Sequence, residues 1–463
     1  MLKFGSSGIR GVYGKDVTLR TAAELGVALA DHLLKKVNSP LVFVGHDHRS
    51  SSPALAAALR STLLSRGCRV ADCGLCPTPA LAASVKSLGA NAGATITASH
   101  NPPEYNGIKL HNEDGGGFSK IQERELSTSP TSNSRISLVA GEEESIDANS
   151  KHSSLILESI PELRRRKVAI DNSWGTSFLV TPRVLEESGI DILLLNGIAS
   201  SKLYRAFKID RPSQDSAVAE WQEIARINDL CEIVRTTKCG LGAVHDGDAD
   251  RALFIDERGS VISGSNTVSI FAKFALSTGN GKKVVTTVAA SKIVDAIVEK
   301  CGGEVIRTRV GDSAVSEKIR ELGASAAFGG EPSGAYIFPS ISLCPDGPTA
   351  VARFLEILDW ANCKPSQLVG KQKWVMLETS LPCANEVKQS AIQNVIEAAK
   401  SSVRGEVTLV DGVRVDFPDL SWFLIRPSGT EPILRITAEA KGSSSARKLL
   451  RTAQRLTAVT QRR

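Results

Sequence analysis

The sequence has 463 residues, of which 42% are hydrophobic and 23% are charged, and its formal net charge is +6. This length exceeds what one hydrophobic core supports and favours three or four domains of an ordinary globular protein. The 56 basic and 50 acidic residues are spread along the chain with few aromatic residues among them, which argues against nucleic-acid binding and leaves a mild attraction for anionic small molecules.

The N-terminal segment and the cysteines favour a cytoplasmic protein. The segment MLKFGSSGIRG lacks the apolar core of a signal peptide, and no stretch approaches the roughly 18 apolar residues that a membrane span needs. Nine cysteines without the spacing of a disulfide framework are typical of reduced thiols. We therefore expect no membrane association.

A strand, a polar or glycine-bearing loop and a helix rich in alanine and leucine follow one another three times. The three segments are residues 41–67, 167–189 and 283–302. In each, apolar residues at strand spacing give way to helical spacing and then to a glycine, which predicts three α/β units. The tail instead predicts an α+β unit. Its expected strands cover 373–381, 405–417, 421–429 and 432–440, and its expected helices cover 388–401 and 444–458.

Changes in composition predict the borders between these units. Residues 127–154 are polar and rich in serine, and we expect an irregular or mobile connection there. Further borders are predicted near 256–262 and 363–372. The expected domains are residues 1–150, 151–256, 257–366 and 367–463.

The stretch TITASHNPPEYNGIKL, residues 95–110, places Ser99 where a β-prone run opens onto a loop with proline and glycine. No glycine frames this serine as in a nucleophile elbow, and no Ser-x-x-Lys motif follows. His100 is tethered too closely to act readily as the base of a triad. The residues alone therefore leave open how Ser99 would react.

The stretch HDGDADRALFID, residues 245–256, predicts a metal site. Asp246, Asp248 and Asp250 occupy alternate positions, so in extended chain their carboxylates face the same way. A hard divalent cation is their natural counter-charge, and the coordination positions left open suit Mg²⁺ bound together with a phosphate. A solvated acidic loop is the alternative, although the apolar strand that follows disfavours it. An EF-hand is disfavoured because its sixth position, normally glycine, is Arg251.

Two later turns have the residue types that bind a phosphosugar. Residues 425–432, IRPSGTEP, offer a guanidinium fork, hydroxyl donors and a glycine that lets backbone amides approach, although an ordinary hairpin is an alternative. The candidate residues there are Arg426, Ser428, Gly429 and Thr430. Residues 329–338, GGEPSGAYIF, hold Glu331 and Ser333, which can exchange hydrogen bonds with vicinal hydroxyls. No nucleotide-binding motif occurs elsewhere.

Five motifs, in this order, resemble the α-D-phosphohexomutase family over essentially the whole chain. They are FGSSGIRG (4–11), TASHNPPEYNGIKL (97–110), DGDADR (246–251), GEPSG (330–334) and RPSGTEP (426–432). The resemblance implies an α/β protein of four domains around a central cleft, three related α/β domains with mixed sheets and a C-terminal α+β domain. The first and fourth motifs look most like the phosphoglucosamine mutase branch, especially its archaeal-type members.

The resemblance also implies a mechanism. Ser99 would be a phosphoserine that gives its phosphoryl group to a hexose monophosphate and takes back the other phosphate after the 1,6-bisphosphate intermediate turns around. One Mg²⁺ per subunit would be bound by the Ser99 phosphate, Asp246, Asp248 and Asp250. A hexose 1,6-bisphosphate would act as the activator that keeps Ser99 phosphorylated.

The other motif residues take their roles from the same resemblance. Arg10, His100 and Lys109 would lie near the transferring group and would stabilise its charge or move the substrate proton. The implied substrate contacts are Arg251 near the phosphoserine, Glu331 and Ser333 at the 3- and 4-hydroxyls of the sugar, and Arg426, Ser428, Gly429 and Thr430 around the phosphate that does not react.

Three positions depart from the family pattern. Ala335 stands where many members have histidine, residues 45–49 read GHDHR where GRDxR is usual, and Ser6 stands where threonine is common. None belongs to the serine, aspartate or phosphate motif, so we expect these departures to affect substrate preference and not reaction type.

We therefore expect a cytoplasmic, Mg²⁺-dependent phosphosugar mutase, a monomer or homodimer, that interconverts the 6-phosphate and 1-phosphate of glucosamine. Phosphomannomutase or phosphoglucomutase activity is the alternative within the family. A phosphatase would instead release phosphate from a hexose bisphosphate. A protein that binds phosphosugar or metal without turnover is the fourth hypothesis, although it would have no use for a phosphorylatable serine facing a metal loop.

Overall fold

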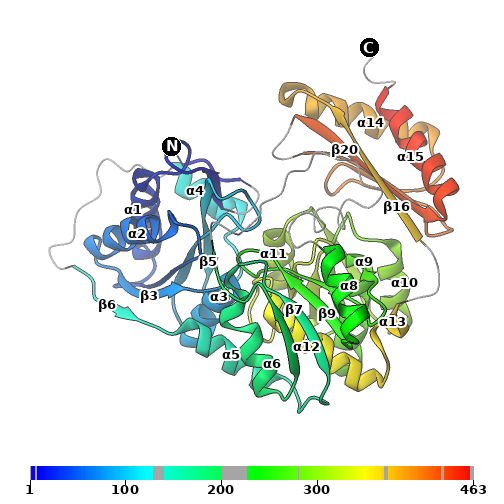
Figure 1. Ribbon diagram of the computed structural model, residues 1–463. Coiled ribbons are helices and arrows are strands. Elements are labelled where there is room, and N and C mark those ends of the chain that lie inside the picture. Colours follow the sequence, from blue (N-terminus) through cyan, green and yellow to red (C-terminus); the bar gives the residue numbers. More distant parts are fainter. Residues whose placement is uncertain are drawn as a thin grey trace.

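The computed structural model describes residues 2–5, 8–128, 140–200, 227–279, 281–369, 374–428 and 432–458. Within these ranges the chain folds into four sheets with helices packed against them (Figure 1). The first sheet lies at the left of the view, the second and third lie next to each other, and the fourth is set apart at the upper right. No helix of the described residues is both long and apolar enough to cross a membrane.

The first sheet places the Ser99 loop at the end of a fully buried strand. Across the sheet its strands are β1 (Ile9–Val12), β5 (Tyr105–Asn112), β4 (Ala92–Ile96), β2 (Leu41–His46), β3 (Arg69–Leu75) and β6 (Glu143–Ser145). Its helices are α1 (Leu19–Leu34), α2 (Ser52–Ser65), α3 (Thr78–Leu88), α4 (Lys120–Thr128) and α5 (Ala148–Ser159). Strand β4 runs parallel to β2 and antiparallel to β5, and all its residues are buried. Ser99 lies in the connection from β4 to β5.

The second sheet places the three aspartates in the same way. Across it lie β11 (Val261–Ile262), β10 (Ala252–Ile255), β9 (Leu241–His245), β7 (Lys167–Asp171) and β8 (Asp191–Leu195). Its helices are η1 (Thr176–Leu179), α6 (Thr181–Glu187) and α8 (Ile227–Thr237). Strand β9 is parallel to β7, antiparallel to β10 and buried throughout. The aspartates occupy the turn from β9 to β10.

The third sheet places the GEPSG turn. Across it lie β13 (Glu304–Thr308), β12 (Lys283–Thr287), β14 (Ala326–Gly330) and β15 (Tyr336–Ile337). Its helices are α9 (Gly264–Thr278), α10 (Lys292–Lys300), α11 (Asp312–Leu322), η2 (Gly323–Ser325), α12 (Gly347–Ala361) and α13 (Pro365–Leu368). Strand β14 is parallel to β12 and antiparallel to β15, so Glu331 and Ser333 follow it in the turn.

The three sheets therefore share one arrangement, which confirms the prediction of related α/β units with mixed sheets. In each, a central strand (β4, β9 or β14) pairs in parallel with the strand that opens a strand–loop–helix segment (β2, β7 or β12) and in antiparallel with the strand that follows it in the chain. The turns β4–β5, β9–β10 and β14–β15 are topologically equivalent. Each carries one of the predicted functional motifs.

The fourth sheet is entirely antiparallel, as the α+β prediction requires. Across it lie β16 (Trp374–Pro382), β20 (Ile433–Lys441), β19 (Trp422–Pro427), β18 (Val413–Asp416) and β17 (Glu406–Thr408). The helical segments of this unit are η3 (Asn385–Val387), α14 (Lys388–Ser402) and α15 (Ser443–Ala458). Arg426 lies at the end of β19, where the phosphate-loop motif begins.

One hydrophobic core joins the second and third sheets. Phe254 of β10 stacks on Phe354 of α12 at a centroid distance of 4.4 Å, and Phe271 of α9 contacts Tyr336 of β15 at 5.0 Å. Strand β11 also pairs with β10, although it lies beyond the border predicted at residue 256. The borders of the four expected domains remain predictions.

The connection predicted to be irregular over 127–154 is regular in part, which corrects that expectation. Residues 129–139 lie outside the described residues, but β6 pairs with β3 and α5 begins at residue 148. Asp147 caps this helix by accepting from the Ser150 amide at 3.0 Å, and Ile156 is buried against the first unit. The serine-rich composition hid a helix whose stability comes from its cap and from burial.

Candidate active site

Ser99 is buried at the end of β4 in a backbone conformation that its surroundings impose. Its φ angle is 49°, in the left-handed region, which costs a residue with a side chain about 1–2 kcal/mol. Its amide donates to Thr97 Oγ1 at 2.9 Å, its hydroxyl donates to Asp246 Oδ2 at 2.7 Å, and its Oγ lies 3.2 Å from His100 Nδ1. The serine of the first unit therefore faces a carboxylate of the second.

Arg49 shapes the loop that carries Ser99. Its guanidinium is buried and donates to the carbonyl oxygens of Ser99 at 2.8 Å and Asn101 at 2.7 Å. It also donates to the carbonyls of Pro102 at 2.6 Å and Tyr105 at 3.0 Å. Its Nε pairs with Asp47 at 3.1 Å. The GHDHR stretch thus scaffolds the serine loop from the loop that follows the neighbouring strand β2.

The three aspartates converge as predicted, but in a turn and not in extended chain, since Ala249 between them has a left-handed φ of 58°. One ligand oxygen from each of Asp246, Asp248 and Asp250 can be chosen so that all lie within 4.8 Å of one another, and all three residues are buried. Asp248 accepts from Thr78 Oγ1 at 2.7 Å and from Lys109 Nζ at 2.8 Å, and Lys109 also donates to Asp250 at 2.5 Å. The Oδ1 atoms of Asp248 and Asp250 are buried and accept no hydrogen bond. This donor set fits a divalent cation with oxygen ligands.

The charges of these groups are strongly coupled. Burial, and then the charges of Asp250 and Asp248, raise the pKa of Asp246 well above its usual range. Burial opposes ionisation of Asp248 as well, but the Lys109 ammonium outweighs it and lowers the pKa of that carboxyl. Burial and the charge of Asp248 raise the pKa of Asp250. The single ammonium of Lys109 therefore does not neutralise three carboxylates. A divalent cation bound between them would supply the missing positive charge.

Two arginines lie close to the serine loop and the aspartate turn. Arg10, on β1, donates to Asn101 Oδ1 at 2.9 Å, and Arg251 Nε lies 4.0 Å from Asp246 and 3.9 Å from Asp250. Burial, Arg251 and Arg10 lower the pKa of His100 well below its usual value, so its imidazole is neutral at neutral pH. The environment of Ser99 can therefore stabilise a phosphoryl group and hold a neutral imidazole beside it.

The sugar-loop candidates lie next to the aspartate turn. Ser333 donates to Glu331 Oε2 at 3.1 Å, and the Gly311 amide donates to Glu331 Oε1 at 2.7 Å. Burial and the negative charge of Asp312 raise the pKa of Glu331 to about 6. Arg251 forms a backbone bridge with Ala335, the position that departs from the family pattern. The β14–β15 turn is thereby attached to the β9–β10 turn.

The phosphate-loop candidates are described only in part. Ser428 is buried and its carbonyl accepts from Lys388 Nζ at 2.6 Å, while Arg426 Nη1 lies 4.0 Å from Asp411 Oδ2. Gly429, Thr430 and Ser6 lie outside the described residues. Burial lowers the pKa of Arg426, whereas the charge of Asp411 acts in the opposite direction. Asp411 also accepts from the amide of Val310 at 3.1 Å, which links the fourth sheet to the third.

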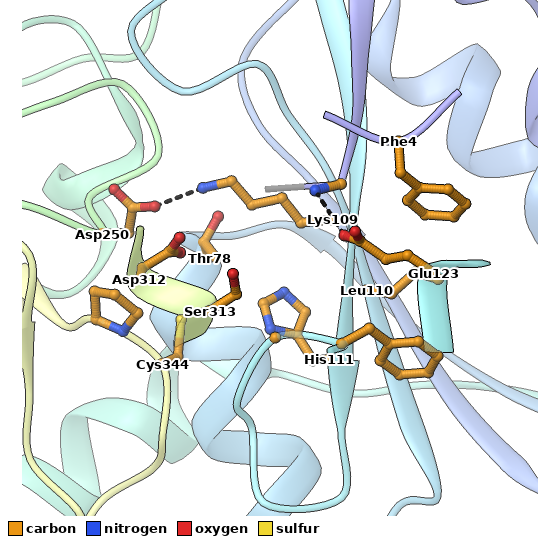
Figure 2. A pocket seen from close by; sticks show the side chains of 14 residues that line it. Phe4, Thr78, Lys109, Leu110, His111, Glu123, Asp250, Asp312, Ser313 and Cys344 are labelled. Carbon is orange, nitrogen blue, oxygen red and sulfur yellow. Dashed lines mark hydrogen bonds and ion pairs between the residues drawn. The ribbon is translucent and has the colours of Figure 1, made fainter. Parts of the chain in front are cut away.

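A pocket beside this cluster reveals side chains that the motifs did not predict. Figure 2 shows Lys109 reaching toward Asp250, with Asp312 next to Asp250 and with the Thr78 hydroxyl nearby. Thr78, Asp312 and Arg49 each contact or face the predicted residues, yet sequence reasoning assigned them no role. The residue types alone gave no signal for Thr78. Asp312 had a signal in the sequence, because it is an acidic residue at the start of a helix. Arg49 had one as well, because it ends an Asp-x-Arg pattern after a buried strand.

Models of the phosphoglucomutase/phosphomannomutase family match most of the chain. The alpha/beta/alpha domain I model matches residues 1–135, the domain III model matches residues 263–373, and the C-terminal domain model matches residues 378–455. The sequence is 36% identical to a probable phosphoglucosamine mutase of Methanopyrus kandleri over 451 residues, which cover 96% of this chain and 95% of that protein. It is 36% identical over 459 residues to a probable phosphoglucosamine mutase of Thermococcus gammatolerans, covering 98% and 97%.

Solved structures resemble the whole chain as well. A phosphoglucomutase/phosphomannomutase family protein from Burkholderia thailandensis superposes with a TM-score of 0.85 at 26% identity, covering 100% of this chain and 98% of that one. A putative phosphomannomutase from Thermus thermophilus superposes with a TM-score of 0.78 at 23% identity, covering 98% of each chain, and this likeness concerns the fold alone.

Proposed function

Because the chain belongs to the phosphoglucomutase/phosphomannomutase family and is a phosphosugar mutase, we propose that it interconverts glucosamine 6-phosphate and glucosamine 1-phosphate through a phosphorylated Ser99. The observation that carries the proposal is the 2.7 Å hydrogen bond from Ser99 Oγ to Asp246 within the aspartate cluster. A phosphorylated serine needs no triad, because its phosphate is already the group to be transferred.

In the transfer, the bond between phosphorus and Ser99 Oγ breaks as a bond to a sugar hydroxyl forms, and that hydroxyl loses its proton. Arg10 and Arg251 are the cations placed to neutralise the phosphoryl charge. His100, neutral and 3.2 Å from Ser99 Oγ, is the group that can take the proton, whereas Lys109, whose pKa Asp248 and Asp250 raise, remains an ammonium that can stabilise negative charge. Asp246, Asp248, Asp250 and the phosphoserine would hold one Mg²⁺, which when bound draws negative charge from the transferring group.

The two ends of the substrate must exchange places between the two transfers. Glu331 and Ser333 would contact the 3- and 4-hydroxyls of the sugar, and the loop of Arg426, Ser428, Gly429 and Thr430 would hold the phosphate that is not reacting. A hexose 1,6-bisphosphate would restore the phosphoserine whenever the intermediate escapes. These roles rest on the family motifs and on the placement of Glu331 and Arg426.

The choice of glucosamine rests on relatives whose names include probable phosphoglucosamine mutase. Phosphomannomutase or phosphoglucomutase activity remains the second candidate, because the family models carry both names. The cysteine usage supports a cytoplasmic enzyme, and we expect a monomer or homodimer with the phosphosugar as its small-molecule partner.

A comparison of kcat/KM tests the proposal. Glucosamine 6-phosphate, glucose 1-phosphate and mannose 1-phosphate would be supplied with Mg²⁺ and a trace of hexose 1,6-bisphosphate, and mass spectrometry would locate the phosphate on the protein. We expect preference for the amino sugar and phosphate on Ser99. Preference for glucose or mannose phosphate would select the second candidate, and release of free phosphate would indicate a phosphatase.

Two variants separate the mechanism from the substrate. Ser99→Ala should abolish turnover without unfolding the protein, whereas Asp248→Asn should lower kcat more than it raises KM. Near-normal turnover by the Ser99→Ala variant would refute the phosphoserine mechanism. Absence of turnover by the wild type with all three sugars, despite binding, would favour the non-catalytic reading.

A further inference from the structure

Asp312 is an acidic residue of the site that the motifs leave without a role. It is the first residue of α11, follows Gly311, and is neither fully buried nor fully exposed. It lines the pocket shared with Lys109 and Asp250, and Figure 2 shows its carboxylate directed toward the side chains of Thr78 and Lys109. Its backbone neighbour Gly311 donates to the Glu331 carboxylate at 2.7 Å. Asp312 thus lies between the metal loop and the sugar loop.

This position puts two carboxylates on the same wall of the site. The charge of Asp312 is, after burial, the main cause that raises the pKa of Glu331 to about 6, so the two carboxylates repel each other. The negative charge of Asp312 also acts on Lys109 and Arg10. A positive group of the substrate near Asp312 and Glu331 would be attracted by both carboxylates.

The geometry of a hexose identifies the part of the substrate that passes Asp312. This step rests on the proposed function, in which the 1-hydroxyl approaches Ser99 and the 3- and 4-hydroxyls contact Glu331. Carbon 2 lies between carbon 1 and carbon 3, so its substituent is held between the Ser99 region and Glu331. In glucosamine that substituent is an ammonium group, and in glucose it is a hydroxyl.

We propose that Asp312 selects the 2-amino sugar, its carboxylate accepting hydrogen bonds from the ammonium group on carbon 2 of the substrate. A hydroxyl at carbon 2 would also donate to this carboxylate but brings no positive charge of its own. Hydrogen bonds to charged groups contribute about 1.5–3 kcal/mol, so the preference for the ammonium is the difference within that range, up to about 1.5 kcal/mol or roughly tenfold. A neutral N-acetyl group has no cation to offer and adds bulk.

The experiment compares Asp312→Asn with the wild type on glucosamine 6-phosphate and glucose 6-phosphate. The substitution keeps the shape of the side chain and removes its charge. We expect kcat/KM for glucosamine 6-phosphate to fall, relative to that for glucose 6-phosphate, by up to about tenfold. Glu321→Gln, which removes an exposed carboxylate from the same helix, is the matched control and should leave the ratio unchanged.

Two outcomes would overturn the assignment. An equal loss of kcat/KM with both sugars would mean that Asp312 acts through Lys109 or Arg10. No loss with either sugar would mean that Asp312 does not contact the amino group.

Inhibition constants separate this inference from the proposed substrate. The wild type could turn over only glucose phosphates and still bind glucosamine 6-phosphate more tightly than glucose 6-phosphate as a competitive inhibitor. If Asp312→Asn removes that difference in inhibition constants, Asp312 selects the amine although the proposed reaction is wrong. N-acetylglucosamine 6-phosphate should compete equally with both proteins.

Discussion

Replacing Arg49 by lysine tests whether the serine loop is held by the loop that follows strand β2. Arg49 makes five side-chain hydrogen bonds, one to Asp47 and four to the carbonyls of the Ser99 loop. Lysine has three donors in a compact head, so at least two partners lose theirs. An unsatisfied buried acceptor costs about 1–3 kcal/mol, and partial exposure of some of these carbonyls favours the lower end, so we expect a loss of about 2–3 kcal/mol of stability.

The same change should reduce turnover more than binding. The left-handed conformation of Ser99, at φ 49°, costs about 1–2 kcal/mol and persists because the loop carbonyls are fixed. Once the loop can relax, the fraction of molecules with Ser99 aimed at Asp246 should fall roughly tenfold, and kcat should fall with it.

Denaturant unfolding, amide exchange of residues 99–105 and steady-state kinetics would measure these effects together. Arg20→Lys, at an exposed pair with Glu24, is the control and should alter none of them. Unchanged amide protection of the loop with a normal kcat would refute the reasoning, because it would show that Arg49 does not hold Ser99 in place.

Three further changes follow from the structure. Arg426→Ala should raise KM with a smaller effect on kcat, measured with glucosamine 6-phosphate, and a loss confined to kcat would contradict its role in holding the distant phosphate. Glu331 has a folded-state pKa of about 6 against an ordinary 4.5, so the folded protein retains its proton longer and loses about 2 kcal/mol of stability as pH rises through this window. The change in melting temperature caused by Glu331→Gln should therefore be more favourable at pH 8 than at pH 4.5, and the substitution should weaken catalysis. Equal changes in melting temperature at both pH values would count against this reasoning. Arg414→Leu leaves the buried Asp416 without its partner and should cost about 3–5 kcal/mol in thermal unfolding, whereas a change within error would show that water replaces the guanidinium.

The units of the fold could be predicted because each depends on local periodicity. The three strand–loop–helix segments and three of the four expected strands of the tail match the observed elements closely, since strand spacing and helical spacing are readable within about 20 residues. The strand expected over 405–417 is instead a hairpin of β17 and β18. The equivalence of the three motif-bearing turns could not be read in this way. It depends on which strands become neighbours, and that is set by packing between segments far apart in the chain.

In the candidate site too, features set by local spacing could be predicted, and contacts between distant segments could not. The convergence of Asp246, Asp248 and Asp250 was predictable from three carboxylates close together in the chain, but the turn with Ala249 at φ 58° that brings them together was not. Thr78 and Asp248 are 170 residues apart, so their hydrogen bond has no local pattern. The Asp-x-Arg pattern marks Arg49 in the sequence, but its partners are mainly backbone carbonyls, which every residue possesses, so the pattern does not show which loop Arg49 holds.

The contact between Ser99 and Asp246 also has a consequence for the order in which the enzyme is made. The two residues are 147 positions apart. At a synthesis rate of about 5–20 residues per second, the serine leaves the ribosome about 7–30 s before its acidic partner. During that interval the first sheet can fold, but its serine stands without the aspartate turn of the second. The nascent chain therefore gains its reactive centre only when two separately made units dock, and a truncated product that ends before residue 246 carries the serine without the site.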